Sequence, residues 1–191
     1  MGFLPFGSIV YQQFIHTPSY TVNEYLESLG YHTIATHPCS EKNWLRDRIY
    51  PLFSFDEMYF DTDYPNEDLI RGFISDQEMY EYIVSLYEGR DTDTPLFLFG
   101  ISMQNHGFYK YEGNDFSNVI ELEGYEGEYP DVEQYLTLLH YSDQALEWLI
   151  HYFETVDNDV VIVFYGDHFP QLDDQFYELE GTTIPEADAG T

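Results

Sequence analysis

Two long apolar runs dominate the hydrophobic pattern of this chain. They occupy residues 96–101 and 160–165, and both are rich in β-branched or aromatic side chains. Uninterrupted runs of this length predict strands that are buried on both faces, as in a parallel sheet. Two further strands are predicted at residues 31–36, where apolar and polar positions alternate, and at residues 57–60.

The segments around these strands have the spacing of amphipathic helices. Helices are predicted over residues 19–30, 41–52, 75–87 and 131–156, and the third begins at a capping-box pattern, Ser75 with Glu78. The longest helix has an apolar stripe that consists of Val132, Leu136, Leu139, Leu146, Leu149 and Phe153. Residues 1–18 are predicted to be irregular, residues 61–73 to form an acidic loop, and residues 107–129 to form a long loop of the kind that is more often functional than idle.

Helices and strands therefore alternate along the chain. This order predicts an α/β fold with a mainly parallel central sheet and helices on both of its faces. Residues 1–191 are expected to belong to a single domain, because a chain of this length can build one core.

Polar side chains follow three of the predicted strands, at the point where each strand ends. His37 follows the first, Asn105 and His106 follow the second, and Asp167 and His168 come after the third and its closing Gly166. Ligands bind at the carboxyl ends of the strands in open α/β sheets, so these residues predict a site there. The Asp167–His168 pair suits a divalent cation such as Mn²⁺, Fe²⁺ or Zn²⁺. The alternative is that Asp167 caps a turn and His168 is an ordinary loop residue.

Charge narrows the range of partners. The chain has 36 Asp and Glu residues against 6 Lys and Arg, a formal net charge of −30. Such a protein repels the phosphates of nucleic acids, so nucleic-acid binding is excluded. A cluster of cationic side chains would stand out against this background.

The sequence shows no recognisable signal peptide or membrane-spanning segment. Its single cysteine, Cys39, allows no internal disulfide, and no apolar run approaches the roughly 20 residues of a membrane helix. The first residues lack the basic region of a signal peptide. Any targeting segment or membrane anchor is expected to lie outside this chain.

Several motifs together resemble the lipoteichoic acid synthase family, the sulfatase-like phosphoglycerol transferases of the alkaline phosphatase superfamily. The motifs are Phe-Tyr-Gly-Asp-His at residues 164–168, Ser-Met-Gln-Asn-His-Gly at 102–107, and His-Tyr-Ser-Asp-Gln-Ala at 140–145. Residues 1–13 also look like the segment that follows the nucleophile in that family, and residues 37–46 resemble its substrate-pocket stretch. The resemblance covers residues 1–172 in the family's order.

The resemblance implies a reaction. Family members use a Thr nucleophile, held on Mn²⁺, to take glycerol phosphate from phosphatidylglycerol and pass it to a growing polymer or a glycolipid. Asp167 and His168 match metal ligands, with Mg²⁺ or Zn²⁺ as other candidates for the cofactor. Arg46, His106 and Trp44 match positions that line the phosphoglycerol pocket. The implied location is the extracytoplasmic face of a bacterial cell membrane.

The chain also departs from the family pattern. The nucleophilic Thr and a metal-binding Glu precede the segment that residues 1–13 match, so both are expected to lie outside this chain, which is then an incomplete catalytic domain that is inactive by itself. Leu45 stands where many relatives carry a polar residue. Two alternatives stay open: a phosphodiesterase, phosphatase or sulfatase of the same superfamily, and a non-catalytic binding module on a degenerate scaffold. Without the resemblance, Trp44 would be assigned to the core and Arg46 to an ion pair with a carboxylate.

Overall fold

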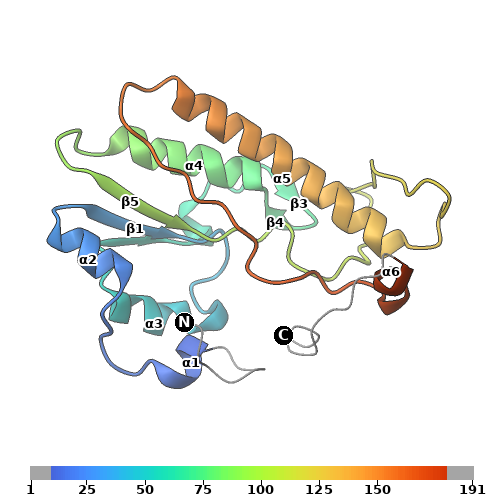
Figure 1. Ribbon diagram of the computed structural model, residues 1–191, viewed down its shortest axis with the longest axis horizontal. Coiled ribbons are helices and arrows are strands. Elements are labelled where there is room, and N and C mark those ends of the chain that lie inside the picture. The colour runs from blue at the N-terminus through green and yellow to red at the C-terminus, as the bar shows by residue number, and fades with distance from the viewer. Residues whose placement is uncertain (1–9, 180–191) are drawn as a thin grey trace. The chain divides into compact units, whose positions relative to one another are not determined.

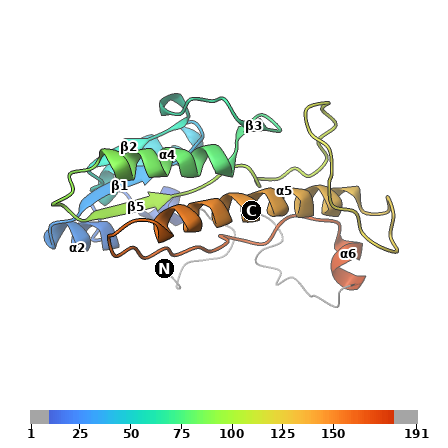
Figure 2. The ribbon, with the colours of Figure 1, turned by 90° about the horizontal axis from the view of Figure 1, so that it is seen from above.

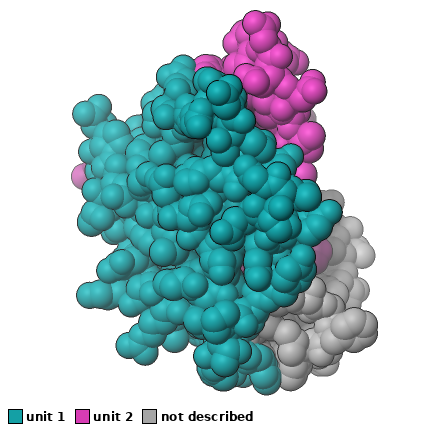
Figure 3. All heavy atoms as spheres, turned by 90° about the vertical axis from the view of Figure 1, so that its left-hand side faces the viewer, with its two compact units in different colours: residues 1–103 teal, residues 104–191 magenta. Residues whose placement is uncertain are grey.

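The computed structural model describes residues 10–179. The chain divides into two compact units, residues 1–103 and residues 104–191 (Figure 3). The first unit contains the sheet, and the second contains the longest helix together with the segments on either side of it.

The sheet of the first unit has three parallel strands, as the pattern of the sequence predicts. β1 (His32–Thr36) lies in the middle, β2 (Glu57–Tyr59) on one side and β5 (Leu96–Gly100) on the other. Ile34 of β1 is opposite Glu57 of β2 and Leu98 of β5. The predicted strands at residues 31–36, 57–60 and 96–101 are therefore confirmed to within a residue or two.

Helices cover both faces of this sheet (Figure 1). α4 (Asp76–Gly89) lies on one face, and it approaches β5 so closely that a Cβ atom at Gly100 would stand 2.6 Å from the Cε atom of Met79. α2 (Val22–Ser28) and α3 (Arg46–Ile49) lie on the other face. The core of the unit includes Ala35, Tyr50 and Phe60, with Phe53, Phe55 and Met58 packed around them.

The start of α4 fulfils half of the predicted capping box. The Ser75 hydroxyl accepts a hydrogen bond from the backbone N–H of Glu78, as an N-cap residue should. The buried carboxylate of Glu78, however, accepts hydrogen bonds from the backbone N–H groups of residues 66, 67 and 68. Glu78 therefore fastens the preceding acidic segment to the helix.

The predictions of a loop at residues 61–73 and of one continuous helix at residues 41–52 are wrong in detail. Residues 61–73 are not only a loop, because they include the 3₁₀ turn η3 (Asp61–Asp63) and part of a hairpin, β3 (Leu69–Ile70) with β4 (Phe73–Ile74).

The helix predicted over residues 41–52 is split into η1 (Asn43–Leu45), α3 and η2 (Tyr50–Phe53). Trp44 and Leu45 have positive φ angles, 54° and 57°, which interrupt a right-handed helix. Of the predicted irregular residues 1–18, Val10–Phe14 form α1, and residues 1–9 lie outside the described part.

The second unit is organised by α5 (Pro130–Glu154), a long continuous helix (Figure 2). Residues 107–129 form the predicted long loop, and polar side chains of α5 hold it in place. The Gln134 amide exchanges two hydrogen bonds with the backbone of Tyr111, and the Thr137 hydroxyl accepts from two successive N–H groups at residues 119 and 120. The loop is thus ordered by side chains in place of a sheet ladder.

This use of polar residues changes the buried face of α5. Val132 and Leu149 are buried as predicted, but Leu139 of the predicted apolar stripe is 44% exposed. Buried positions include Gln134, Leu138 and Ser142 instead. The spacing of hydrophobic residues does not predict a helix face that is buried through hydrogen bonds. The predicted apolar stripe is therefore only partly confirmed. A short helix, α6 (Asp174–Leu179), ends the described part.

The strand predicted at residues 160–165 is wrong for the described structure. The segment is neither helix nor strand, and Val161 and Val163 are 87% and 77% exposed. A strand exists only where a neighbouring strand completes its backbone hydrogen bonds, and an apolar run cannot supply that neighbour. Asp167 and His168 accordingly follow an extended exposed segment, not a central strand.

Candidate functional site

The first element of the candidate site is His37, directly after β1. The ring is fully buried, and its Nδ1–H donates to the carbonyl oxygen of Ile101 at 2.8 Å. The backbone N–H of His37 donates to the carbonyl oxygen of Tyr59 at 3.0 Å. His37 therefore joins the carboxyl end of β1 to the ends of both neighbouring strands.

Trp44 and Arg46 lie beside this histidine. The Trp44 ring meets the His37 ring edge to face, with centroids 6.0 Å apart. The Arg46 guanidinium carbon stands 4.6 Å from the centroid of the Trp44 ring, a cation–π contact. The positive φ angles at Trp44 and Leu45 turn the chain between His37 and α3, and the turn aims both side chains to the same place.

Arg46 is held in a fixed position. Its side chain is only 5% exposed, its Nε–H donates to the Tyr50 hydroxyl at 3.1 Å, and one terminal N–H donates to the Asn43 carbonyl oxygen at 3.3 Å. These bonds use two of the five N–H donors of a guanidinium. The planar guanidinium, with its other N–H donors, lies over the Trp44 ring.

The charge of Arg46 is not neutralised by a carboxylate. Within residues 10–179, none of the ion pairs that the structure describes involves Arg46. Arg46 donates instead to the phenol of Tyr50, and its charge also influences the phenol of Tyr11. Burial raises the pKa of Tyr50 and of Tyr11 above the ordinary value, and the positive charge of Arg46 opposes that rise only in part. Both phenols are thus neutral at physiological pH and place no negative charge beside the guanidinium.

Neither Tyr11 nor Tyr50 is among the site residues predicted from the sequence. Tyr50 lies four residues after Arg46 in a helical segment, a spacing that places two side chains on the same face. That spacing was the available signal for Tyr50. Nothing in the sequence pattern links Tyr11, on α1, to Arg46.

His106 belongs to the second unit. Its side chain is exposed, and its Nδ1–H donates to the Gly107 carbonyl oxygen at 2.8 Å. The two preceding amides are anchored to α5, since Asn105 and Gln104 both donate to the Ser142 hydroxyl, at 2.7 and 3.1 Å. The loop that carries His106 is therefore fixed at its start, and its approach to Arg46 stays a prediction.

Asp167 and His168 form a close pair of donor groups. The Nδ1–H of His168 donates to the Phe169 carbonyl oxygen at 2.8 Å, which leaves Nε2 as the ring atom suited to a metal. That Nε2 atom lies 3.7 Å from Oδ2 of Asp167. Two ligands that each bind one ion at about 2.0–2.2 Å can adopt this separation, so the pair fits two positions of a Mn²⁺ or Zn²⁺ site. Within residues 10–179, no His, Cys, Asp and Glu side chains gather in groups of three or more that could hold a metal.

The fold and this arrangement define a class of protein before any comparison. A parallel sheet with helices on both faces, with His37 directly after its central strand and Arg46 near that histidine, is an α/β architecture in which ligands bind at the carboxyl ends of the strands. In the part of the chain that the structure describes, no helix is long and apolar enough to cross a membrane.

Comparison with known proteins gives the family. The Sulfatase family model matches residues 4–190, and the chain belongs to the sulfatase family. The chain is 30% identical over 177 residues to a Rhizobium meliloti protein named for cyclic beta-1,2-glucan modification, covering 90% of this chain and 27% of that protein. It is 29% identical over 149 residues to the capsular polysaccharide biosynthesis protein RkpI of the same organism, covering 77% of the chain and 26% of RkpI. The chain thus spans about a quarter of the length of these relatives.

Solved structures confirm the alkaline phosphatase and sulfatase type of fold. The phosphoglycerol transferase GacH of Streptococcus pyogenes, solved with sn-glycerol-1-phosphate, superimposes with a TM-score of 0.69 at 24% identity, over 88% of this chain and 44% of GacH. The lipoteichoic acid synthase LtaP of Listeria monocytogenes gives a TM-score of 0.62 at 21% identity, over 78% and 36%. The predicted resemblance is confirmed at the level of the family and the fold.

Proposed function

We propose that this chain is part of a metal-dependent phosphoglycerol transferase that moves glycerol phosphate from phosphatidylglycerol to a polymer or glycolipid. The observation that carries the proposal is Arg46. A guanidinium that is 5% exposed, in a protein of net charge −30, has phenols and an indole around it and no carboxylate ion pair among the described residues. Burying a charge without a partner is unfavourable, so an anionic ligand is its natural complement.

The geometry suits a phosphate with a small polar substituent. Arg46 would donate to two phosphate oxygens at once, as planar guanidinium groups do. Trp44, which already packs against Arg46 and His37, would form an apolar wall for the glycerol carbons. His106 would donate to a phosphate or glycerol oxygen.

Asp167 and His168 would hold Mn²⁺, or Mg²⁺ or Zn²⁺, through the Oδ2 and Nε2 atoms that lie 3.7 Å apart. When bound, the metal polarises phosphoryl oxygens and lowers the pKa of the attacking hydroxyl. The nucleophile is a Thr that the motifs of residues 1–191 do not include. The extracytoplasmic membrane surface, where phosphatidylglycerol is available, is the proposed location, and residues 1–191 form one incomplete catalytic domain.

The names of the curated relatives favour a particular acceptor. One is named for cyclic beta-1,2-glucan modification and the other for capsular polysaccharide biosynthesis, and both are matched over most of this chain. An acceptor built of sugars is therefore our second candidate beside a glycerol phosphate polymer. Hydrolysis, with water as acceptor, is the competing reaction within the superfamily.

The test uses the complete gene product that carries these residues, in membranes that contain fluorescent phosphatidylglycerol. We expect release of diacylglycerol that requires Mn²⁺ and that falls at least about tenfold in Arg46→Ala, since a hydrogen bond to a charged group contributes about 1.5–3 kcal/mol. Addition of cyclic beta-1,2-glucan should yield a phosphoglycerol-substituted glucan if the acceptor is a glycan.

Two outcomes would contradict the proposal. One is full activity of Arg46→Ala, and the other is turnover of sulfate or phosphate monoesters in preference to phosphatidylglycerol. Arg48→Ala is the matched control, because Arg48 lies on the same helix with an exposed side chain. Mn²⁺ binding, followed by electron paramagnetic resonance in His168→Ala, tests the metal assignment separately from activity.

A further inference from the structure

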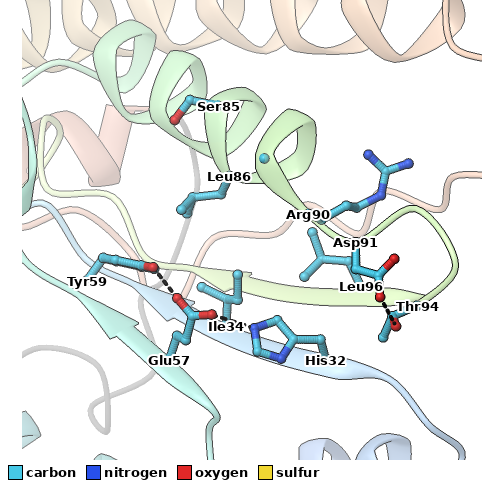
Figure 4. Close-up of a pocket in the computed structure, with 11 residues that line it drawn as sticks. His32, Ile34, Glu57, Tyr59, Ser85, Leu86, Arg90, Asp91, Thr94 and Leu96 are labelled. Atoms are coloured by element: carbon cyan, nitrogen blue, oxygen red, sulfur yellow. Dashed lines mark hydrogen bonds and ion pairs between the residues drawn. The ribbon is translucent and has the colours of Figure 1, made fainter.

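An open cavity of about 430 Å³ lies between the sheet and the C-terminal end of α4 (Figure 4). It is formed by the first residues of β1 and β5, by β2, and by the end of α4 with the turn that follows. Its volume falls within the range of small-molecule sites. Arg46 begins α3, on the other face of the sheet from α4, so a ligand in this cavity would not touch Arg46.

The floor of the cavity is apolar. Ile34 of β1 and Leu96 of β5 contribute from the sheet, and Leu86 points toward them from α4. This surface would favour a ligand with a short hydrocarbon segment.

One wall carries a carboxylate that is held in place. Oε1 of Glu57 accepts a hydrogen bond from Nε2 of His32 at 2.7 Å, and Oε2 accepts one from the Tyr59 hydroxyl. The bonds from Tyr59 and His32 lower the pKa of Glu57, so its charge persists well below neutral pH. Each carboxylate oxygen can accept a further hydrogen bond.

The facing wall carries a second fixed carboxylate, Asp91. Its Oδ1 accepts from the backbone N–H of Asp93 at 3.1 Å and its Oδ2 from the Thr94 hydroxyl at 3.3 Å. Asp91 and Glu57 stand on opposite sides of the cavity in Figure 4.

The arginine at the rim does not offset these charges across the cavity. The guanidinium carbon of Arg90 lies 3.5 Å from the centroid of the Tyr87 ring, and the group donates to the Tyr87 carbonyl oxygen. Figure 4 shows the Arg90 side chain directed away from Glu57 and His32. Arg90 therefore interacts with Tyr87 in the last turn of α4.

We propose that this cavity binds an aliphatic amine, with ammonium groups at Glu57 and Asp91 and the alkyl chain over the apolar floor. The combination of fixed anionic groups and an apolar surface between them matches an alkylammonium ion better than a metal ion or a neutral sugar. The net charge of −30 raises the local concentration of any cation and assists binding. This site is separate from the anion site of Arg46 and does not depend on the transferase proposal.

The experiment is a titration of the 191-residue chain with 1,4-diaminobutane at constant ionic strength, maintained with sodium chloride. We expect saturable shifts in the amide NMR signals of Ile34, Gly89 and Leu96. Glu57→Gln and Asp91→Asn should each weaken binding by about fivefold, the effect of one exposed ion pair. Asp93→Asn is the matched control, because Asp93 lies outside the cavity and contributes only its backbone N–H to Asp91; its affinity should stay within about twofold of the unchanged chain.

The outcomes separate specific binding from general attraction. Shifts that do not saturate, or an equal loss of affinity in Asp93→Asn, would mean that the diamine responds to overall charge, and the proposal fails. Equal binding of 1,4-butanediol, which has the same shape without charge, also overturns it. Circular dichroism checks that each variant is folded, and if Glu57→Gln does not fold, Asp91→Asn decides the question.

Discussion

His32 and His37 lie at opposite ends of β1 and have opposite surroundings. His32, at the start, is partly exposed, with Nε2 2.7 Å from Glu57 and Nδ1 3.4 Å from Asp56. His37, just past the end, is fully buried against a carbonyl oxygen and the Trp44 ring. The amino end of the sheet is rich in carboxylates, and the carboxyl end has aromatic rings and a guanidinium.

The difference shows how a strongly acidic protein can keep a place for an anion. Carboxylates surround His32 at one end of the strand, but at the other end the groups that hold Arg46 are the neutral phenol of Tyr50 and a carbonyl oxygen. A phenol orients a guanidinium without cancelling its charge.

Removal of Arg46 should have the largest effect. Arg46→Ala is expected to lower the affinity for sn-glycerol 1-phosphate by about tenfold to a hundredfold, because the charge-assisted bonds contribute about 1.5–3 kcal/mol. Arg46→Lys should fall between, because it keeps the charge and loses the fork. Calorimetric titration measures both. Comparable losses in Arg48→Ala, on the exposed face of the same helix, would remove the distinction between the two ends of the sheet.

The Tyr50 hydroxyl should matter for both stability and anion binding. Tyr50→Phe deprives the buried Nε–H of Arg46 of its acceptor, which should destabilise the fold by about 1–3 kcal/mol and weaken glycerol phosphate binding by about threefold. Urea unfolding and calorimetry give the two quantities. Tyr64→Phe is the control, since this equally buried phenol bonds to Thr36 and is remote from any arginine contact. It should lose stability alone, and a matching loss of affinity would contradict a positioning role for Tyr50.

At the carboxylate-rich end, Glu57 should control the ionisation of Tyr59. The hydrogen bond to Glu57, together with burial, raises the pKa of Tyr59 to about 12. The phenol is thus stabilised in its neutral form, and this contribution is present below pH 10 and lost as the pH rises toward 12. Glu57→Gln should lower the pKa of Tyr59 by about one unit or more, in an ultraviolet titration of tyrosinate against Tyr59→Phe. An unchanged titration would show that the hydrogen bond is not formed.

The smallest effect should be on acid stability. The pKa of Glu57 is lowered in the folded protein by the bonds from Tyr59 and His32. Its contribution is therefore complete at neutral pH and is lost as the pH falls below the ordinary range of a glutamate. Because its side chain is 43% exposed, the contribution should be only a few tenths of a kcal/mol. Glu57→Gln should flatten the acid limb of stability against pH by this amount, and Glu27→Gln, at an exposed site on α2, should not.

The hydrophobic pattern of the sequence determined the helices and strands whose signals are local. The three strands at residues 32–36, 57–59 and 96–100 and the helices α4 and α5 follow from local spacing and from Ser75, because each of these signals lies within a few neighbouring residues. The motifs at residues 37–46 and 102–107 likewise indicated the family, which the comparison with the Sulfatase model confirms. Arg46 and Trp44 were found as candidates in this way.

Tertiary structure alone decided which of these residues meet and which groups surround them. The charge of Arg46 influences Tyr11, which lies on a helix more than 30 residues earlier in the chain, and Glu78 bonds to residues 66–68. No local sequence pattern encodes either interaction. Residues 160–165 have the composition of a strand but do not form one. Strand propensity belongs to the segment itself, whereas strand pairing requires a neighbouring strand. Sequence specifies side-chain chemistry and local backbone preference, whereas burial and charge compensation arise only when distant segments come into contact.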